Sequence, residues 1–116
     1  MKRGDVVLVH VPYVGTSGAK IRPALIIQCD RLNGMIKETI IAAITSNVSN
    51  AHQPHQLLIE LSTADGAASG LLMDSAVRCE RLHTVLQSDI QRIIGHLPAA
   101  LVAQIDTCVK AALEIP

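Results

Sequence analysis

The sequence of 116 residues predicts a mainly β fold, in which a small, curled, barrel-like sheet is closed by one C-terminal α-helix. Short runs rich in β-branched residues alternate with turn residues over the first three quarters of the chain, as is typical of strands. The C-terminal segment instead repeats apolar residues at three- and four-residue spacing, which is typical of an amphipathic helix. We expect residues 1–116 to form a single domain, because this length supports one hydrophobic core but not two.

The predicted strands are short and are bounded by turn residues. They fall at residues 5–11, 23–28, 38–45, 57–61, 75–79 and 83–86. Pro12 ends the first strand, because proline cannot donate a ladder hydrogen bond. Residues 12–20, PYVGTSGAK, are expected to form an exposed loop, as is the polar segment 47–56. A turn is expected around Asn33-Gly34, between the two most apolar strands.

Two helices are expected near the C-terminal end. Ser88–Gln91 has the Ser-x-x-Gln form of a capping box, which predicts a short helix through Ile94 that Gly95 ends. Pro98, at a first helical position, then begins a longer helix. The apolar face of this helix carries Leu101, Ile105, Val109, Ala112 and Leu113.

Composition argues against several classes of protein. The apolar stretches are far shorter than the ~20 residues that a membrane span needs, and no secretory signal is visible, so we expect a cytoplasmic protein without a membrane partner. Cys29, Cys79 and Cys108 are odd in number and widely spaced, which fits reduced thiols. The net charge is +0, and six basic residues against three acidic ones in residues 1–58 could either focus an anion or be ordinary surface scatter.

Familiar catalytic and cofactor motifs are missing from the sequence, among them the phosphate-binding loop and the nucleophile elbow. His52-x-x-His55 is the nearest approach to a metal pair, but it lies in a proline-containing loop without a matching Cys-x-x-Cys. We therefore expect neither a metal nor another cofactor. Cys29 and Cys79 lie inside or beside strands and are expected to be buried and unreactive.

Polar residues remain at the predicted strand ends. Arg22 precedes Pro23, and a residue before proline is held in an extended conformation, so the backbone sets the direction of the Arg22 side chain. Thr45 and Ser46 end the apolar strand ETIIAAIT, and Arg78-Cys79-Glu80 closes another strand. Each of these alone is more typical of a strand end that meets solvent, and periodicity cannot show whether they converge.

An ordered series of segments resembles the MazF/PemK toxins. The segments are KRGD and VVLV at residues 2–9, RPALIIQ at 22–28, ITS at 44–46, GL, DS and VRC between 70 and 79, LHT at 82–84 and IGHL at 94–97. The resemblance covers nearly the whole chain and implies an SH3-like barrel of the CcdB/PemK type that forms a homodimer. It also implies a metal-independent, sequence-specific endoribonuclease (an mRNA interferase) that cleaves single-stranded RNA and is held inactive by a cognate antitoxin.

The resemblance also implies site residues. In the family, the arginine of the Arg-Pro motif and the threonine that ends the next strand are the central catalytic pair, which here are Arg22 and Thr45. Kid-type members rely instead on an arginine and an acidic residue, which here are Arg78 and Glu80. Either Glu80 or Thr45 could act as the base toward the 2′-hydroxyl of the RNA, which leaves a cyclic phosphate and a 5′-hydroxyl. Tyr13, Lys20 and Ser46 are expected to contact the RNA.

Two other functions stay open on the sequence. A gyrase-poisoning CcdB-like protein shares the implied fold, but that group ends in an aromatic-Gly-Ile tail, whereas this chain ends in ALEIP. The second alternative is a family member that binds an antitoxin or RNA without cutting, and the presence of Arg22, Thr45 and Ser46 counts against it.

Overall fold

The computed structural model describes residues 1–12 and 19–116. Within these ranges, six strands form one antiparallel sheet in the order β4-β5-β3-β2-β1-β6. The strands are β1 (Asp5–Pro12), β2 (Ala19–Ile26), β3 (Glu38–Thr45), β4 (Gln56–Ile59), β5 (Ser75–Leu86) and β6 (Ile90–His96). The helices are α1 (Asp30–Asn33), α2 (Ala64–Ala67), the 3-10 turn η1 (Gln87–Asp89) and α3 (Ala99–Leu113).

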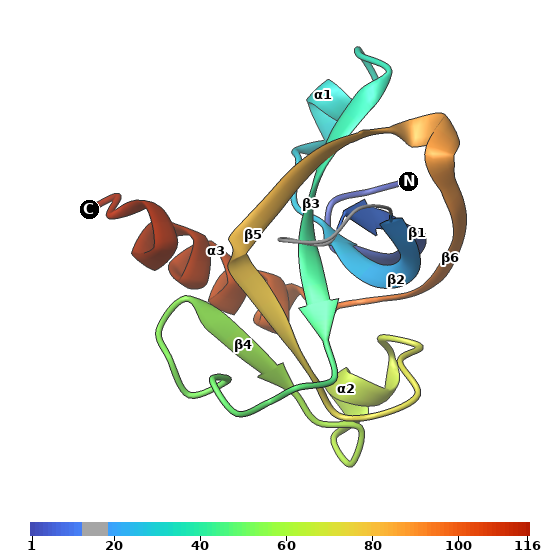
Figure 1. The fold of residues 1–116 in the computed structure, drawn as a ribbon. Coiled ribbons are helices and arrows are strands. Elements are labelled where there is room, and N and C mark those ends of the chain that lie inside the picture. The colour runs from blue at the N-terminus through green and yellow to red at the C-terminus, as the bar shows by residue number, and fades with distance from the viewer. Residues whose placement is uncertain (13–18) are drawn as a thin grey trace.

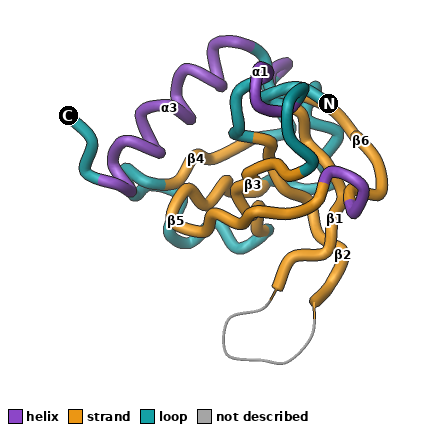
Figure 2. The backbone as a smooth tube through the Cα atoms, turned by 90° about the horizontal axis from the view of Figure 1, so that it is seen from above, coloured by secondary structure: helices purple, strands orange, loops and turns teal. Residues whose placement is uncertain are grey.

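The sheet curls around on itself, with β5 and β6 sweeping around β1 and β2, and α3 lies outside the curl (Figure 1). Helix α3 packs against β4 and β5, while β1 and β2 extend away from it (Figure 2). The prediction of a mainly β, barrel-like sheet with a C-terminal helix is therefore confirmed. None of the helices in the described part of the chain is long and apolar enough to cross a membrane.

Alternating side chains divide the core into two clusters, one on each face of the sheet. Even-numbered residues of β3 point to the cluster that α3 covers, and odd-numbered residues point to the other. The α3 cluster contains Val6, Leu25, Ala42, Ile44, Leu57, Ile59, Val77, Cys79, Leu97, Ile105 and Cys108. The second cluster contains Val7, Val9, Val11, Ala24, Ile26 and Ile41. This division fixes which polar side chains can share a face.

Strand β3 has the predicted bounds, but β2 begins earlier than predicted. It runs from Ala19, so Lys20 lies in a strand rather than in a loop, and Arg22 lies within the strand rather than at its start. Pro23 lies just past the last β2–β3 pair, at Ala24, and pairs with Leu8 of β1 alone, so it has a strand partner on one side only. The predicted strand at 57–61 is displaced by one or two residues, to β4. Helices α1 and α2, of four residues each, are too short for sequence periodicity to reveal.

One long strand replaces the two predicted at residues 75–79 and 83–86. In the pairing of β3 with β5, Ala42 lies opposite Leu82 and the next residue, Ala43, lies opposite Arg78. One residue along β3 therefore corresponds to four residues along β5. Three extra residues on β5 form a bulge that keeps the ladder continuous on either side. Glu80 therefore lies in the bulge in mid-strand, and not at a strand end as predicted.

The helix predicted from Ser88 to Ile94 is wrong. The segment forms η1 and then β6, which pairs with β1 from Asp5 opposite His96 to Val9 opposite Ile90. The isoleucines of this segment favour a strand, and the free edge of β1 supplies the partner, so tertiary pairing overrides the local capping pattern. This error also misplaces Arg92, which the structure sets opposite Leu8.

The predicted C-terminal helix is confirmed as α3, with one change at its start. Pro98 is the N-cap residue, with φ −60° and ψ 160°, rather than the first helical residue. Ile105 and Cys108 are the buried residues of the helix. The helix ends at Leu113, and its C-cap residue Glu114 has a left-handed φ of 54°.

Replacing Ile105 by alanine should lower the free energy of unfolding by about 2–5 kcal/mol, because the side chain is 1% exposed and fills the core under α3. Urea unfolding followed by circular dichroism measures this change. The matched control is Leu113→Ala on the same helix, where the side chain is 55% exposed and the expected change is within about 0.5 kcal/mol. Equal effects of the two substitutions would contradict the packing of α3.

Candidate active site

Three of the predicted catalytic residues lie on three neighbouring strands near the end of β3, and two of them, Thr45 and Arg78, line the same hollow. Thr45 is the last residue of β3, and two residues earlier Ala43 pairs with Ala24 of β2 and with Arg78 of β5. Arg22 lies on β2 two residues beyond the last β2–β3 pair, Ala24 with Ala43. Arg78 is then a diagonal neighbour of Thr45, within reach of a long side chain. The sheet thus brings together residues that are far apart in the sequence.

Two hollows flank the end of β3. The smaller, of about 80 Å³, is lined by Thr45, Asn47, Asn50, Gln56 and Arg78. The larger, of about 320 Å³, contains both Arg22 and Ser46 among its lining residues, with mostly apolar residues around them. Neither aspartate nor glutamate lines either hollow within the described residues. Together the hollows present guanidinium and hydroxyl groups, which are the groups that bind phosphate.

Glu80 is the centre of a polar network beside the smaller hollow. Its Oε2 accepts hydrogen bonds from Nε and Nη2 of Arg78, each at 3.2 Å, and from Nε2 of Gln56 at 3.0 Å. The Nε2 atom of His55 lies 4.0 Å from the same oxygen. Glu80 lies in the bulge of β5, two residues after Arg78 and without a partner in the β3–β5 register.

Hydrogen bonds and charge determine the ionisation of Glu80. Partial burial acts to raise its pKa, but a backbone hydrogen bond and the Gln56 and Arg78 side chains outweigh burial. The pKa of Glu80 therefore lies below its ordinary value of 4.5, and the group is a carboxylate at neutral pH.

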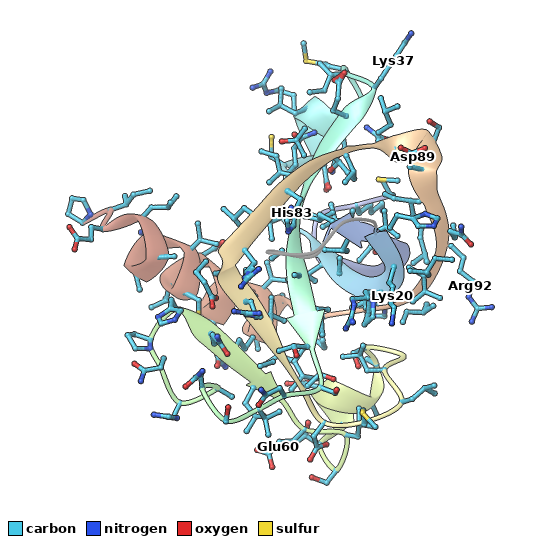
Figure 3. The ribbon with its side chains drawn as sticks, in the orientation of Figure 1. Lys20, Lys37, Glu60, His83, Asp89 and Arg92 are labelled. Atoms are coloured by element: carbon cyan, nitrogen blue, oxygen red, sulfur yellow. The ribbon has the colours of Figure 1, made fainter. Side chains whose placement is uncertain are left out.

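The predicted RNA contacts are more scattered. Ser46 is exposed at the larger hollow, next to Thr45 but on the other side of β3. Lys20 is exposed on β2, opposite Val11, and Figure 3 labels it with Arg92 on β6. Tyr13 falls outside the described residues, so its contact with RNA stays a prediction.

The structure adds residues that the sequence gave no reason to choose. Arg92 joins the larger hollow because Leu8 pairs with Pro23 on one side and with Arg92 on the other. Interpreting residues 90–96 as a strand would have indicated the face of the sheet on which Arg92 lies, but the Ser-x-x-Gln capping pattern predicted a helix there instead. Gln56 is buried at the first position of β4. In the sequence, its position as a polar residue at the start of an apolar strand was the one feature that could have indicated a site residue.

Within residues 1–12 and 19–116, no three His, Cys, Asp or Glu side chains come together as a cluster that could bind a metal ion. All three cysteines are free thiols, and burial, with a smaller effect of Cys108, raises the pKa of Cys79 to about 12. Cys79 is therefore unreactive, as predicted. Cys29 is exposed, so the prediction that it is buried is wrong, because β2 ends three residues before it.

The curled antiparallel sheet and its rim of arginine and hydroxyl groups define a small β-barrel protein suited to bind phosphate. A family model described as "PemK-like, MazF-like toxin of type II toxin-antitoxin system" matches residues 2–113. The chain therefore belongs to this toxin family.

Curated relatives and solved structures agree with this membership. The endoribonuclease MazF6 of Mycobacterium tuberculosis is 32% identical over 105 residues, which cover 90% of this chain and 88% of the relative. The endoribonuclease EndoA of Bacillus subtilis is 29% identical over 116 residues, covering 99% of this chain and 96% of EndoA.

Two solved structures confirm the predicted barrel of the CcdB/PemK type. A mycobacterial endoribonuclease in complex with its cognate antitoxin has a TM-score of 0.80 at 18% identity, covering 100% of this chain and 97% of that one. The Mycobacterium tuberculosis toxin MazF-mt6 has a TM-score of 0.78 at 20% identity, covering 97% of this chain and 98% of that one.

The network around Glu80 makes a prediction about pH. Because the pKa of Glu80 is lowered on folding, its carboxylate stabilises the fold above pH 4.5, and this contribution is lost as the pH falls through the folded-state value. Glu80→Gln should therefore be less stable than wild type at pH 6, and the difference should shrink toward pH 3 in urea titrations. The control is Glu60→Gln, at an exposed carboxylate. A difference for Glu80→Gln that does not change with pH would contradict this account.

Proposed function

We propose that this toxin is an endoribonuclease that cleaves single-stranded RNA without a metal ion, using the RNA's own 2′-hydroxyl as the nucleophile. The observation that carries the proposal is that Thr45 and Arg78 line one hollow at the end of β3, with Glu80 bonded to Arg78, while Arg22 lines the second hollow beside it. Membership of the toxin family and the endoribonuclease names of its curated relatives support the activity.

The reaction needs donors that stabilise the phosphorane and a base, which the site supplies, and an acid, a role that we assign to a water molecule. Attack of the 2′-oxygen on the adjacent phosphorus forms a crowded, doubly charged phosphorane and then expels the 5′-oxygen. Arginine stays protonated and presents a planar fork of donors, so Arg22 and Arg78 are suited to stabilise the phosphorane. The proton of the 2′-hydroxyl goes to a base, and the leaving 5′-oxygen receives a proton from an acid.

Thr45 and Glu80 are the candidates for proton handling. Thr45 Oγ1 accepts a hydrogen bond from the backbone N–H of Asn47 at 3.1 Å, which leaves its O–H to donate to a phosphate oxygen. Glu80 is ionised at neutral pH, and the side-chain hydrogen bonds that described residues give it all reach Oε2. We therefore assign the base to Glu80, acting through Oε1, and phosphate binding to Thr45.

The larger hollow suits a protein partner. Its apolar lining combined with Arg22 and Arg92 would receive a segment that carries both acidic and apolar side chains, as we expect of a cognate antitoxin. An antitoxin seated there would cover Arg22 and so block the RNA. One solved relative is described as bound to its cognate antitoxin, which supports this partner. We also infer a cytoplasmic location and a single domain over residues 1–116.

The catalytic assignment predicts cleavage of RNA in the presence of EDTA, with 5′-hydroxyl and cyclic-phosphate ends. Arg22→Ala, Thr45→Val, Arg78→Ala and Glu80→Gln should each slow cleavage by about 10²–10⁴-fold, because each removes charge stabilisation or proton transfer. Initial rates on a long single-stranded RNA, with end groups identified by phosphatase and kinase treatment, measure the effect.

The control is Arg31→Ala, which removes an exposed arginine on α1 and should leave the rate unchanged. Wild-type cleavage that requires a divalent ion would exclude the proposed chemistry. Full activity of Arg22→Ala would remove Arg22 from the site, and a wild type that binds RNA without cutting it would favour the non-cleaving alternative.

We further infer a homodimer, because large apolar side chains are exposed on one protomer. Leu72 is 96% exposed, and Met73, Ile93 and Ile21 are about half exposed, which is unusual for a small protein that stays monomeric. Light scattering after gel filtration at micromolar concentration should give twice the chain mass of 12.4 kDa. A strictly monomeric mass would contradict the inference.

A further inference from the structure

His55 lies next to the carboxylate of the candidate active site. Its ring nitrogen Nε2 is 4.0 Å from Oε2 of Glu80, and its side chain is 33% exposed. The backbone carbonyl of His55 accepts the N–H of Cys79 at 3.1 Å, which fixes the His55 backbone beside the segment of β5 that carries Glu80. Arg78 bonds to the same Glu80 oxygen. No other carboxylate of the described residues, on β4, β5 or α3, lies at ion-pair distance from the ring.

The proposed reaction needs a source for the proton of its leaving group. Transfer of the phosphate from the 5′-oxygen to the 2′-oxygen releases one proton and consumes another. Glu80 can take up the first, but it is a carboxylate at neutral pH and has no proton to give to the 5′-oxygen. Arg22 and Arg78 keep their protons. Water alone is a weak acid, so a stronger acid that supplies the water with a proton would speed departure of the 5′-oxygen.

Histidine is the side chain suited to supply that proton, because it ordinarily titrates between about pH 5 and 8. His83, further along β5 (Figure 3), is unsuited because burial, with a smaller effect of Arg81, lowers its pKa and so favours its neutral form. His52 is exposed in the loop before β4, where its Nε2 lies 3.4 Å from the amide nitrogen of Gln53. Of the histidines in the described part of the chain, His55 is the one at ion-pair distance from a carboxylate.

We propose that protonated His55 supplies the proton to the water that protonates the leaving 5′-oxygen. A protonated imidazole carries an N–H on each of its two nitrogens. Nε2–H faces the Glu80 carboxylate, which orients the ring, so Nδ1–H is left to bind the water. As the bond between phosphorus and the 5′-oxygen breaks, the water gives one proton to that oxygen and takes the Nδ1 proton.

The cycle then closes without a net change in protons. Glu80 loses to solvent the proton that it took from the 2′-hydroxyl, and His55 regains one. Both side chains are about a third exposed, which allows this exchange. Because His55 acts on the RNA only through the water, it is a positioning residue that holds and supplies the acid.

This inference rests on the proposed function, and its test uses a substrate that needs no acid. Two short RNAs carry the same mapped cleavage site, one with the natural 5′-oxygen and one with a bridging sulfur in its place, which departs as a stable thiolate without a proton. His55→Gln should slow cleavage of the oxygen RNA by about 10²-fold and of the sulfur RNA by less than about threefold. Glu80→Gln should slow both, because the 2′-hydroxyl must lose its proton in either RNA.

The pH profile is a second readout, which a purely structural role of His55 would leave unchanged. Cleavage of the oxygen RNA by wild type should slow as the pH rises through the range in which histidine loses its proton, about pH 5 to 8. His55→Gln should lack this alkaline decline, and so should wild type on the sulfur RNA, a comparison that needs no variant. His52→Gln, at an exposed histidine of the same loop, is the matched control and should behave as wild type on both RNAs.

Thermal unfolding verifies that each variant is folded. Absence of cleavage of the oxygen RNA by wild type would overturn the proposed function itself. Cleavage by wild type with equal slowing of the oxygen and sulfur RNAs in His55→Gln, or with an alkaline decline that persists in this variant, would overturn the inference about His55 alone.

Discussion

The pairing of β3 with β2 on one side and β5 on the other is the constraint on which the site depends. Because Ala43 pairs with both Ala24 and Arg78, the end of β3 carries Thr45 between the two arginine-bearing strands. The apolar residues on both faces of β3 hold this register, since a slip of one residue would move each buried side chain to the opposite face and disrupt the packing of both clusters. The stability of the core and the geometry of the site therefore have the same cause.

The bulge in β5 supplies the carboxylate of the candidate active site. It places three extra residues opposite one step of β3, and one of them, Glu80, bonds to Arg78 of the same strand. One carboxylate oxygen then orients both the guanidinium of Arg78 and the amide of Gln56. Loss of the Glu80 charge would therefore disturb both side chains.

The sequence was sufficient for the fold class and for the bounds of β3 and α3, because long apolar runs and a helical period are local signals. The catalytic pair Arg22 and Thr45 was reached only through family resemblance, since neither spacing nor burial distinguishes them from ordinary strand residues. The β5 bulge and the role of Gln56 depend on register between strands, which no local pattern encodes. Arg92 was not predicted as a site residue because the Ser-x-x-Gln capping pattern predicted a helix at residues 88–94. The segment instead forms β6, which pairs with the free edge of β1.

The central claim is that the 2′-hydroxyl of the RNA is the nucleophile at a site built only from side chains. The most direct measurement uses a short RNA that contains one mapped cleavage site, with a single 2′-deoxy nucleotide on the 5′ side of the cut. In EDTA, wild-type protein should cut the all-ribose strand to a cyclic phosphate and a 5′-hydroxyl and should leave the substituted bond intact. Cleavage of the substituted bond, or a 5′-phosphate product, would contradict the account.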